Sequence, residues 1–229
     1  MLSKFILIVL ILINVKAFAD EVPLNNIVAN YALFYKNIDA GTMRLEIQSN
    51  NNYVQIRTKY DGNFLAELAN RGYREEISLL KKEMSDLKIE KYSYTDEKDA
   101  YNAIYEDINK VKIIDEKNSQ NFYLNSDEII YDPLSLLLHL MTKYPNVKDS
   151  YNVISKKSLK IYNYLYKDKQ SMIINNNSYT GFSAEYTSGN KTNFFLFSRD
   201  HNNLMVLTSI KKKGKEKIRI ELRDIEYIN

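Results

Sequence analysis

Apolar and polar residues alternate along much of this chain, with the period of two that indicates β-strands having one buried and one solvated face. The clearest run is 43–47, where Met43, Leu45 and Ile47 alternate with polar residues. Residues 31–35 alternate in the same way, and the short turn 37–41 joins the two runs. This arrangement predicts a β-hairpin, which a turn at 50–52 and a further run at 54–60 extend into a meander.

The last third of the chain has the same character. Residues 204–210 and 218–222 alternate on either side of the turn Lys211-Lys212-Lys213-Gly214, which predicts a second hairpin. Residues 194–198 form a continuous apolar run that is also typical of a strand. Between the two hairpins, short strands are expected at 87–94, 101–105 and 111–114, and Leu65, Leu68 and Ala69 could form a helical turn.

One segment departs from the period of two. Asp132 can cap a helix, Pro133 fits its first turn, and Pro145 ends it after Tyr144, so a short helix is expected at about 132–144. Its apolar residues surround the axis: Leu134, Leu136, Leu137, Leu138, Leu140 and Met141. Because a helix that is apolar all round must be covered, we expect a mainly β fold. A curved antiparallel sheet or open barrel (β-roll) would enclose this one helix.

The first nineteen residues have the features of a cleavable signal peptide. Lys4 precedes the apolar run 5–15, and Ala17-Phe18-Ala19 offers the small-x-small site that a signal peptidase cleaves. The apolar run is shorter than the roughly twenty residues that a membrane-spanning helix needs. We therefore expect cleavage after Ala19, no transmembrane span after cleavage, and a single β-rich domain over residues 20–229 in the bacterial periplasm.

Composition argues against several classes of function. The formal net charge of +3 falls to +1 when Lys4 and Lys16 leave with the signal peptide, whereas nucleic-acid binding needs a strongly basic face. The chain has no cysteine, and therefore no disulfide, thiol nucleophile or lipid-modified cysteine. With 6 glycines, 3 prolines and no internal repeat, nothing indicates a linker between domains.

Catalytic and metal-binding motifs are not found. Gly181-Phe182-Ser183-Ala184-Glu185 lacks the second glycine of a nucleophile elbow and is typical of a strand. His139 and His201 lie far apart without ligand spacing, so neither a metal nor a cofactor is expected. We interpret His139 as a hydrogen-bonded core residue and His201 as part of a turn. We expect a non-enzymatic protein; the alternative of an unrecognised envelope hydrolase needs a carboxylate or His201 beside a Ser or Tyr hydroxyl.

Two features suggest binding surfaces. Tyr162, Tyr164 and Tyr166 would project from one face of a strand, offering aromatic surface and hydroxyls to a lipid or glycan. The alternative is that they pack across neighbouring strands. The lysines at 211–217 could touch anionic headgroups at a membrane surface, or they could form a solvated hairpin tip.

Three short stretches occur in an order and spacing that span nearly all of the mature chain. They are 31–41 with Leu45, 132–137 with Leu140, and 195–200 before the last hairpin. Together they resemble an exported bacterial family, the domain of unknown function numbered 3108. That family tends to have Arg and Pro at the places of Met141 and Met205. The resemblance implies a β-rich envelope protein with no established enzymatic role, similar in architecture to lipoprotein and lipid carriers, and it supplies no catalytic residues.

Two functional hypotheses follow from these features. The first is an exported soluble envelope protein that binds a lipid, another apolar ligand or an exposed partner segment in a hydrophobic concavity. The second is a structural or assembly factor that contacts an envelope protein partner through its sheet edges and has a packed interior. The two differ in whether the concave face of the sheet is empty or filled.

Overall fold

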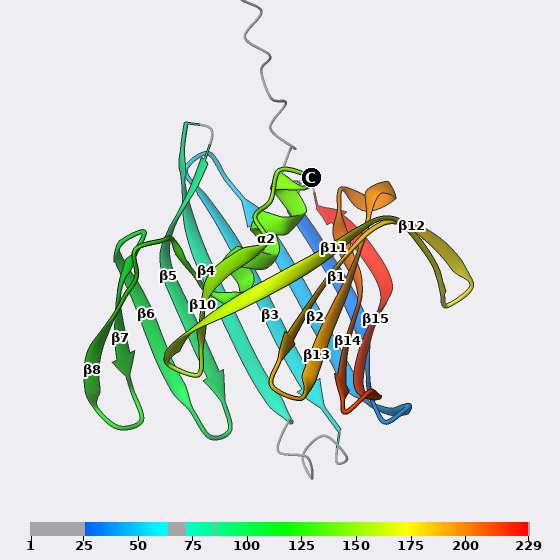
Figure 1. Cartoon of the computed structure of the whole chain (residues 1–229), viewed down its shortest axis with the longest axis horizontal. Coiled ribbons are helices and arrows are strands. Elements are labelled where there is room, and N and C mark those ends of the chain that lie inside the picture. Colours follow the sequence, from blue (N-terminus) through cyan, green and yellow to red (C-terminus); the bar gives the residue numbers. More distant parts are fainter. Residues whose placement is uncertain (1–25, 64–71, 85, 229) are drawn as a thin grey trace, which may run out of the picture.

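The structure is a computed structural model that describes residues 26–63, 72–84 and 86–228. In these residues one sheet of fifteen strands curls into a nearly closed barrel around a single short helix, α2 (Figure 1). The predicted mainly β fold with one enclosed helix is therefore confirmed. The predicted signal peptide and the possible helical turn at 65–69 lie outside the described residues.

The sheet order is β8-β7-β6-β5-β4-β3-β2-β1-β15-β14-β13-β12-β11-β10-β9, so the first and last long strands, β1 and β15, pair near its middle. All neighbouring pairs are antiparallel except the short parallel pair of β9 and β10. In chain order the strands are β1 (Asn26–Tyr35), β2 (Ile38–Ser49), β3 (Tyr53–Gly62), β4 (Tyr73–Glu83), β5 (Asp86–Asp96), β6 (Ala100–Asp107), β7 (Lys110–Asp115), β8 (Gln120–Asn125), β9 (Ile130–Tyr131), β10 (Ser150–Ser155), β11 (Ser158–Ile174), β12 (Asn177–Ser188), β13 (Lys191–Ser198), β14 (Leu204–Lys212) and β15 (Lys215–Ile228).

The predicted hairpins are present as β1–β2 and β14–β15, and β3 extends the first one. The strands expected at 87–94, 101–105 and 111–114 are β5, β6 and β7. Strands β4, β8 and β10 and the two-residue strand β9 were missed. Along β2 the residues of the apolar phase, Met43, Leu45 and Ile47, are at most 1% exposed, so the alternation in the sequence marks the inner face of the barrel.

Helix α2 (Pro133–Lys143) begins and ends within a residue of the predicted bounds. Asp132 caps it: one carboxylate oxygen accepts hydrogen bonds of 2.9 Å from the backbone N–H groups of Leu134 and Ser135. The Ser135 hydroxyl accepts a 3.0 Å hydrogen bond from the Asp132 N–H, which completes a capping box. Because Leu134, Leu138 and Met141 are at most 5% exposed, the barrel wall covers the helix as its composition predicts.

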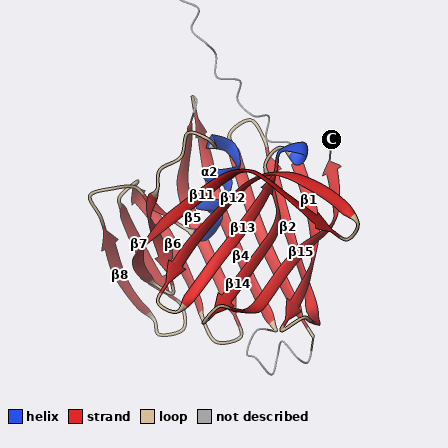
Figure 2. Ribbon diagram, turned by 45° about the vertical axis from the view of Figure 1, so that its right-hand side comes forward, coloured by secondary structure: helices blue, strands red, loops and turns tan. Residues whose placement is uncertain are grey.

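The carboxyl-terminal end of the helix is held by the other half of the sheet. The ring of Tyr144, which follows the helix, stacks on Phe182 of β12 with 3.6 Å between ring centres, and Phe182 stacks on Phe197 of β13. The side-chain amide of Asn203 donates a 3.0 Å hydrogen bond to the carbonyl of Met141. In Figure 2, β11 and β12 cross in front of the helix, which therefore lies within the curve of the sheet.

Lys157, in the turn between β10 and β11, links regions near the two ends of the sheet. Its ammonium group lies 2.6 Å from a carboxylate oxygen of Asp99, in the turn after β5, and 2.7 Å from one of Asp115, at the end of β7. The hydrogen bond from Lys157 is the main cause that lowers the pKa of Asp115 to about 2. This charged group therefore helps to close the barrel between the two ends of the sheet, where no strands of the described residues pair.

Candidate functional site

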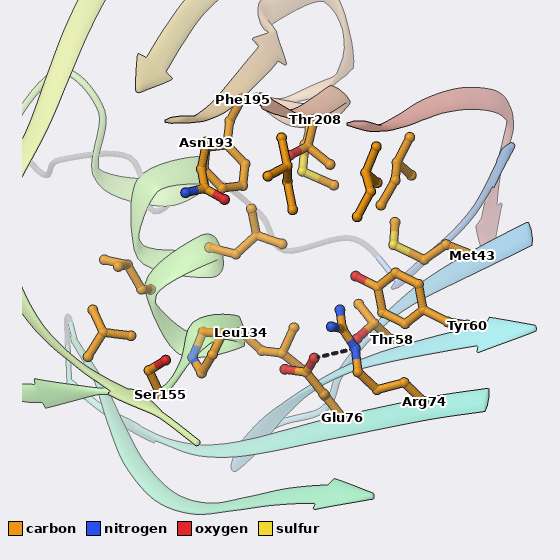
Figure 3. Close-up of a pocket in the computed structure, with 18 of the residues that line it drawn as sticks. Met43, Thr58, Tyr60, Arg74, Glu76, Leu134, Ser155, Asn193, Phe195 and Thr208 are labelled. Carbon is orange, nitrogen blue, oxygen red and sulfur yellow. Dashed lines mark ion pairs between the residues drawn. The ribbon is translucent and has the colours of Figure 1, made fainter. Parts of the chain in front are cut away.

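A cavity of about 490 Å³ lies inside the barrel, between helix α2 and the inner face of the sheet (Figure 3). This volume is within the range of roughly 300–1,000 Å³ that is usual for small-molecule sites. The exposed residues in its lining, Tyr73, Pro133 and Lys156, mark where it reaches the surface. Tyr73 is the first residue of β4, and Lys156 lies in the turn between β10 and β11. The interior of this barrel is therefore not completely filled by side chains.

One side of the cavity is apolar. It is formed by the helix and by the strands that pair around β1 and β15. The apolar side chains on this side include Leu33, Met205, Ile210, Ile218 and Ile220 from the strands, and Leu134, Leu136, Leu137 and Leu140 from the helix. A surface of this kind favours the burial of hydrocarbon, because each CH₂ group removed from water contributes about 0.8 kcal/mol.

Another part of the cavity lining is polar and comes from three consecutive strands, β3–β5, of which β3 and β4 also contact helix α2. Tyr60 of β3 pairs in register with Arg74 of β4, and Glu76, two residues further along β4, pairs with Tyr94 of β5. All of them line the cavity, as does Tyr92. Because residues two apart in a strand share a face, the spacing of Arg74 and Glu76 places both inside the barrel. We call Tyr60, Arg74, Glu76, Tyr92 and Tyr94 the polar wall.

Arg74 and Glu76 form an ion pair at the centre of the polar wall. The Nε atom of Arg74 lies 2.9 Å from one carboxylate oxygen of Glu76, and the hydroxyl of Tyr92 donates a 2.7 Å hydrogen bond to the other oxygen. The Arg74 guanidinium also lies over the ring of Tyr60, 4.0 Å from its centre. The Glu76 side chain is 6% exposed, whereas that of Arg74 is 36% exposed, and Figure 3 shows its terminal nitrogens directed towards the cavity.

The predicted tyrosine row exists on β11, but the cavity takes in only part of it. Tyr162 and Tyr164 line the cavity, whereas Tyr166 does not, and the Tyr166 hydroxyl donates a 3.0 Å hydrogen bond to the carbonyl of Lys148. Tyr162 and Tyr164 also pack against Tyr186 of β12, with 4.2 and 5.0 Å between ring centres. Cross-strand packing and cavity lining thus occur together. Ligand binding by these three tyrosines stays a prediction.

Carboxylates do lie beside hydroxyl groups, as the hydrolase alternative requires. Tyr92 donates to Glu76, but burial, followed by the charge of Glu76, raises the pKa of Tyr92 well above its ordinary value. Ser78 donates to Asp132 at 2.9 Å, but both residues are 0% exposed and neither lines the cavity. These hydroxyls are therefore held as neutral hydrogen-bond donors, and no histidine lines the cavity beside them.

The two histidines are separate from the cavity. His201 lies in a short 3₁₀ turn, η1 (Arg199–His201), as predicted, and its Nδ1 is 3.5 Å from the Tyr227 hydroxyl. His139 packs between the rings of Tyr131 and Tyr151, and burial is the main cause that lowers its pKa to about 4. Its ring makes no hydrogen bond within the described part of the chain, so the prediction that His139 is hydrogen-bonded is wrong, and aromatic rings surround it instead.

Residues 181–185 lie in strand β12, as predicted. A Cβ on Gly181 would be 1.8 Å from the Phe197 carbonyl oxygen, so this glycine allows the close approach of β13.

Among the described residues, no group of three or more His, Cys, Asp or Glu side chains is placed to hold a metal ion.

Lys212 and Lys215 flank the tip of the β14–β15 hairpin, as the sequence predicts. No helix within residues 26–63, 72–84 and 86–228 is long and apolar enough to span a membrane. The predicted contact of the lysine tip with anionic headgroups stays a prediction.

These features define the class of the molecule: a mainly β, nearly closed antiparallel barrel that holds one helix and an internal cavity with an apolar and a polar side. No protein-family model matches the chain, and no curated protein matches it significantly. The resemblance to the domain of unknown function numbered 3108 therefore stays a prediction.

Proposed function

We propose that this protein is an exported, non-enzymatic protein of the bacterial envelope that binds an apolar ligand, such as a lipid chain, inside its barrel. One observation carries the proposal: the cavity of about 490 Å³ between helix α2 and the sheet, lined on one side by aliphatic residues. An empty apolar cavity loses packing contacts, and a protein that keeps one forgoes stability that larger side chains would supply. A ligand that fills it would restore those contacts.

A partner segment is a second possible occupant of the same site. A short apolar stretch of an unfolded or lipid-modified partner offers the same hydrocarbon surface as a lipid chain. A partner segment differs from a lipid chain in that most of the partner protein would remain outside the barrel. The cavity reaches the surface beside Tyr73 and Lys156, so a longer molecule would leave the barrel at that point.

The proposal is tested by native mass spectrometry of the mature protein purified from its own envelope without detergent. We expect a species heavier than residues 20–229 alone, and lipid extraction should return it to the protein mass. A stable protein partner instead of a lipid would favour the partner segment. A protein that is always unliganded, and that takes up no long-chain compound after purification, would contradict the proposal. The observed mass also tests cleavage after Ala19.

The assembly hypothesis retains one supporting observation. Strand β8 is an end of the described sheet, and it exposes Phe122 and Tyr123 at 36% and 46%. Such an edge can accept a further strand from a partner. Cross-linking through a photoreactive residue placed at Asn121 would test it. Transfer to an envelope protein supports this role, and an equal yield from a probe at Lys82, near the end of β4, would count against it.

A further inference from the structure

We infer that the ligand is an amphiphile with an oxyanionic head group, and that the head group binds Arg74 in the polar wall. This inference rests on the proposed function, and it specifies the class of ligand. The cavity has one apolar side and one polar side, so its ligand should have the same division. Its hydrocarbon would lie along the helix and the strands around β1 and β15, and its polar group would face β3–β5.

The hydrogen-bonding capacity of Arg74 indicates what the head group must supply. A guanidinium group carries five N–H donors and accepts no hydrogen bonds. In the described part of the chain the Nε of Arg74 faces Glu76, and the terminal nitrogens donate to no residue. Because the Arg74 side chain is 36% exposed and lines the cavity, these terminal nitrogens are accessible to a ligand there. The terminal nitrogens form a planar fork that matches the two oxygens of a carboxylate.

The neighbouring carboxylate is less accessible to a ligand than the guanidinium, because the Glu76 side chain is 6% exposed and that of Arg74 is 36% exposed. One oxygen of Glu76 faces Arg74, and the other accepts the hydrogen bond from Tyr92. The accessible charged group of the polar wall is therefore the Arg74 guanidinium, which only donates hydrogen bonds. A hydrogen bond with an ionised acceptor is roughly twice as strong as one between neutral groups, so an acid should bind more tightly than an alcohol of the same length. An amine, which carries a positive charge, should bind least.

The cavity lining carries further charges of both signs. Lys156 is positive and exposed, whereas Asp96, which pairs in register with Arg74, is negative and half-buried. A positive group at the mouth of a cavity raises the local concentration of anions, and the charge of Asp96 reduces this effect. The negative charge of Glu76 weakens the attraction of Arg74 for an incoming anion. Glu76 thus limits the affinity of the site for an anion, and removing its charge should strengthen the binding of an anion.

The test is isothermal titration of the full mature chain with dodecanoate, dodecanol and dodecylamine at pH 8. We expect dodecanoate to bind roughly tenfold more tightly than dodecanol, the difference between a charged and a neutral hydrogen-bond partner. Arg74→Gln should abolish this preference and leave dodecanol binding in place. Glu76→Gln should strengthen dodecanoate binding several-fold, because it removes the competing charge and retains the shape of the side chain.

Arg57→Gln is the matched control. Arg57 of β3 forms an ion pair with Glu75 of β4, and neither residue lines the cavity, because both lie on the outer face of the sheet. It should change none of the affinities. Thermal melts and near-ultraviolet circular dichroism establish that each variant is folded. If Arg74→Gln does not fold, the change in dodecanoate affinity caused by Glu76→Gln decides whether the head group binds at Arg74.

The outcomes separate the inference from the function on which it rests. Equal binding of the acid and the alcohol, or a Glu76→Gln variant that binds dodecanoate no more tightly than the wild type, would overturn the head-group assignment and leave the carrier role standing. Failure of all three compounds to bind would overturn both. Tighter binding of the amine than of the acid would overturn the inference, because it would show that the polar wall favours a positively charged head group.

Discussion

Ser78 of strand β4 donates a 2.9 Å hydrogen bond to the carboxylate of Asp132, the residue that caps helix α2. The other oxygen of the same carboxylate accepts from the first turn of the helix. Both side chains are 0% exposed. A single buried carboxyl group thus satisfies the helix end and joins the helix to the barrel wall, and the position of the helix determines one side of the cavity.

Replacing Asp132 by alanine should strongly destabilise the protein. The substitution removes the N-cap and leaves the Ser78 hydroxyl without its acceptor, so we expect a loss of roughly 2–4 kcal/mol in the free energy of unfolding. Urea denaturation followed by circular dichroism measures it. Asp127→Ala, at an exposed position five residues earlier, is the control and should change stability by less than about 0.5 kcal/mol. Equal effects of the two variants would contradict the role of Asp132.

The same carboxyl group should make stability depend on pH. Burial is the main cause that raises the pKa of Asp132 from 3.8 to about 6 in the folded protein. Between about pH 4 and 6 the folded state therefore binds more protons than the unfolded state, and the contribution of this group to stability falls as the pH rises.

Asp132→Asn keeps a side-chain oxygen for the helix cap and removes the titration. Relative to this variant, the wild type should lose up to roughly 3 kcal/mol of unfolding free energy from pH 4 to pH 7, which corresponds to about two pKa units. Urea denaturation at pH 4, 5, 6 and 7 measures the difference. Parallel curves for the two proteins would show that the carboxyl group does not titrate in this range.

Lys157→Met should weaken the closure of the barrel. The variant leaves the carboxylates of Asp99 and Asp115, which the ammonium group bridges, without their positive partner. We expect the melting temperature to fall by several degrees and the amide protons of β7 and β10 to exchange faster. Lys160→Met, at an exposed position on the adjoining strand β11, is the control. A β7 protection pattern unchanged from the wild type would contradict this role.

Leu137→Trp should occupy part of the cavity. Leu137 is half-buried on the helix and lines the cavity, so a larger side chain at this position takes the space of a ligand. We expect the affinity for a twelve-carbon compound to fall at least tenfold, while the fold is retained. Since the chain has no tryptophan, the introduced residue is its only indole, and the indole fluorescence reports on the site. Unimpaired binding would place the ligand elsewhere.

The sequence predicted the elements whose pattern of polar and apolar residues matches their burial in the fold. Met43, Leu45 and Ile47 alternate because one face of β2 is buried, and Asp132 with Pro133 marks a helix start through local chemistry alone. Strand β4 was missed because its inward positions include Arg74, Glu76 and Ser78, so its polarity does not alternate. Strand β8 was missed because most of it is exposed on both faces.

The same feature explains why the polar wall was not predicted. An arginine and a glutamate two residues apart are ordinary on a solvated strand, and only the curl of the sheet places them inside. The aromatic row on β11 was found because three tyrosines at a spacing of two stand out, and two of them line the cavity. Which residues line the cavity depends on how strands that are far apart in the sequence pack together, and no local sequence pattern encodes this packing.

The most direct test of the account is a crystal structure of the protein purified from its envelope without removal of bound lipid. The account predicts continuous density for a chain between helix α2 and strands β13–β15, with its polar end near Arg74. A cavity closed by the collapse of the helix onto the sheet, or a ligand found only on the outer face of the barrel, would contradict it.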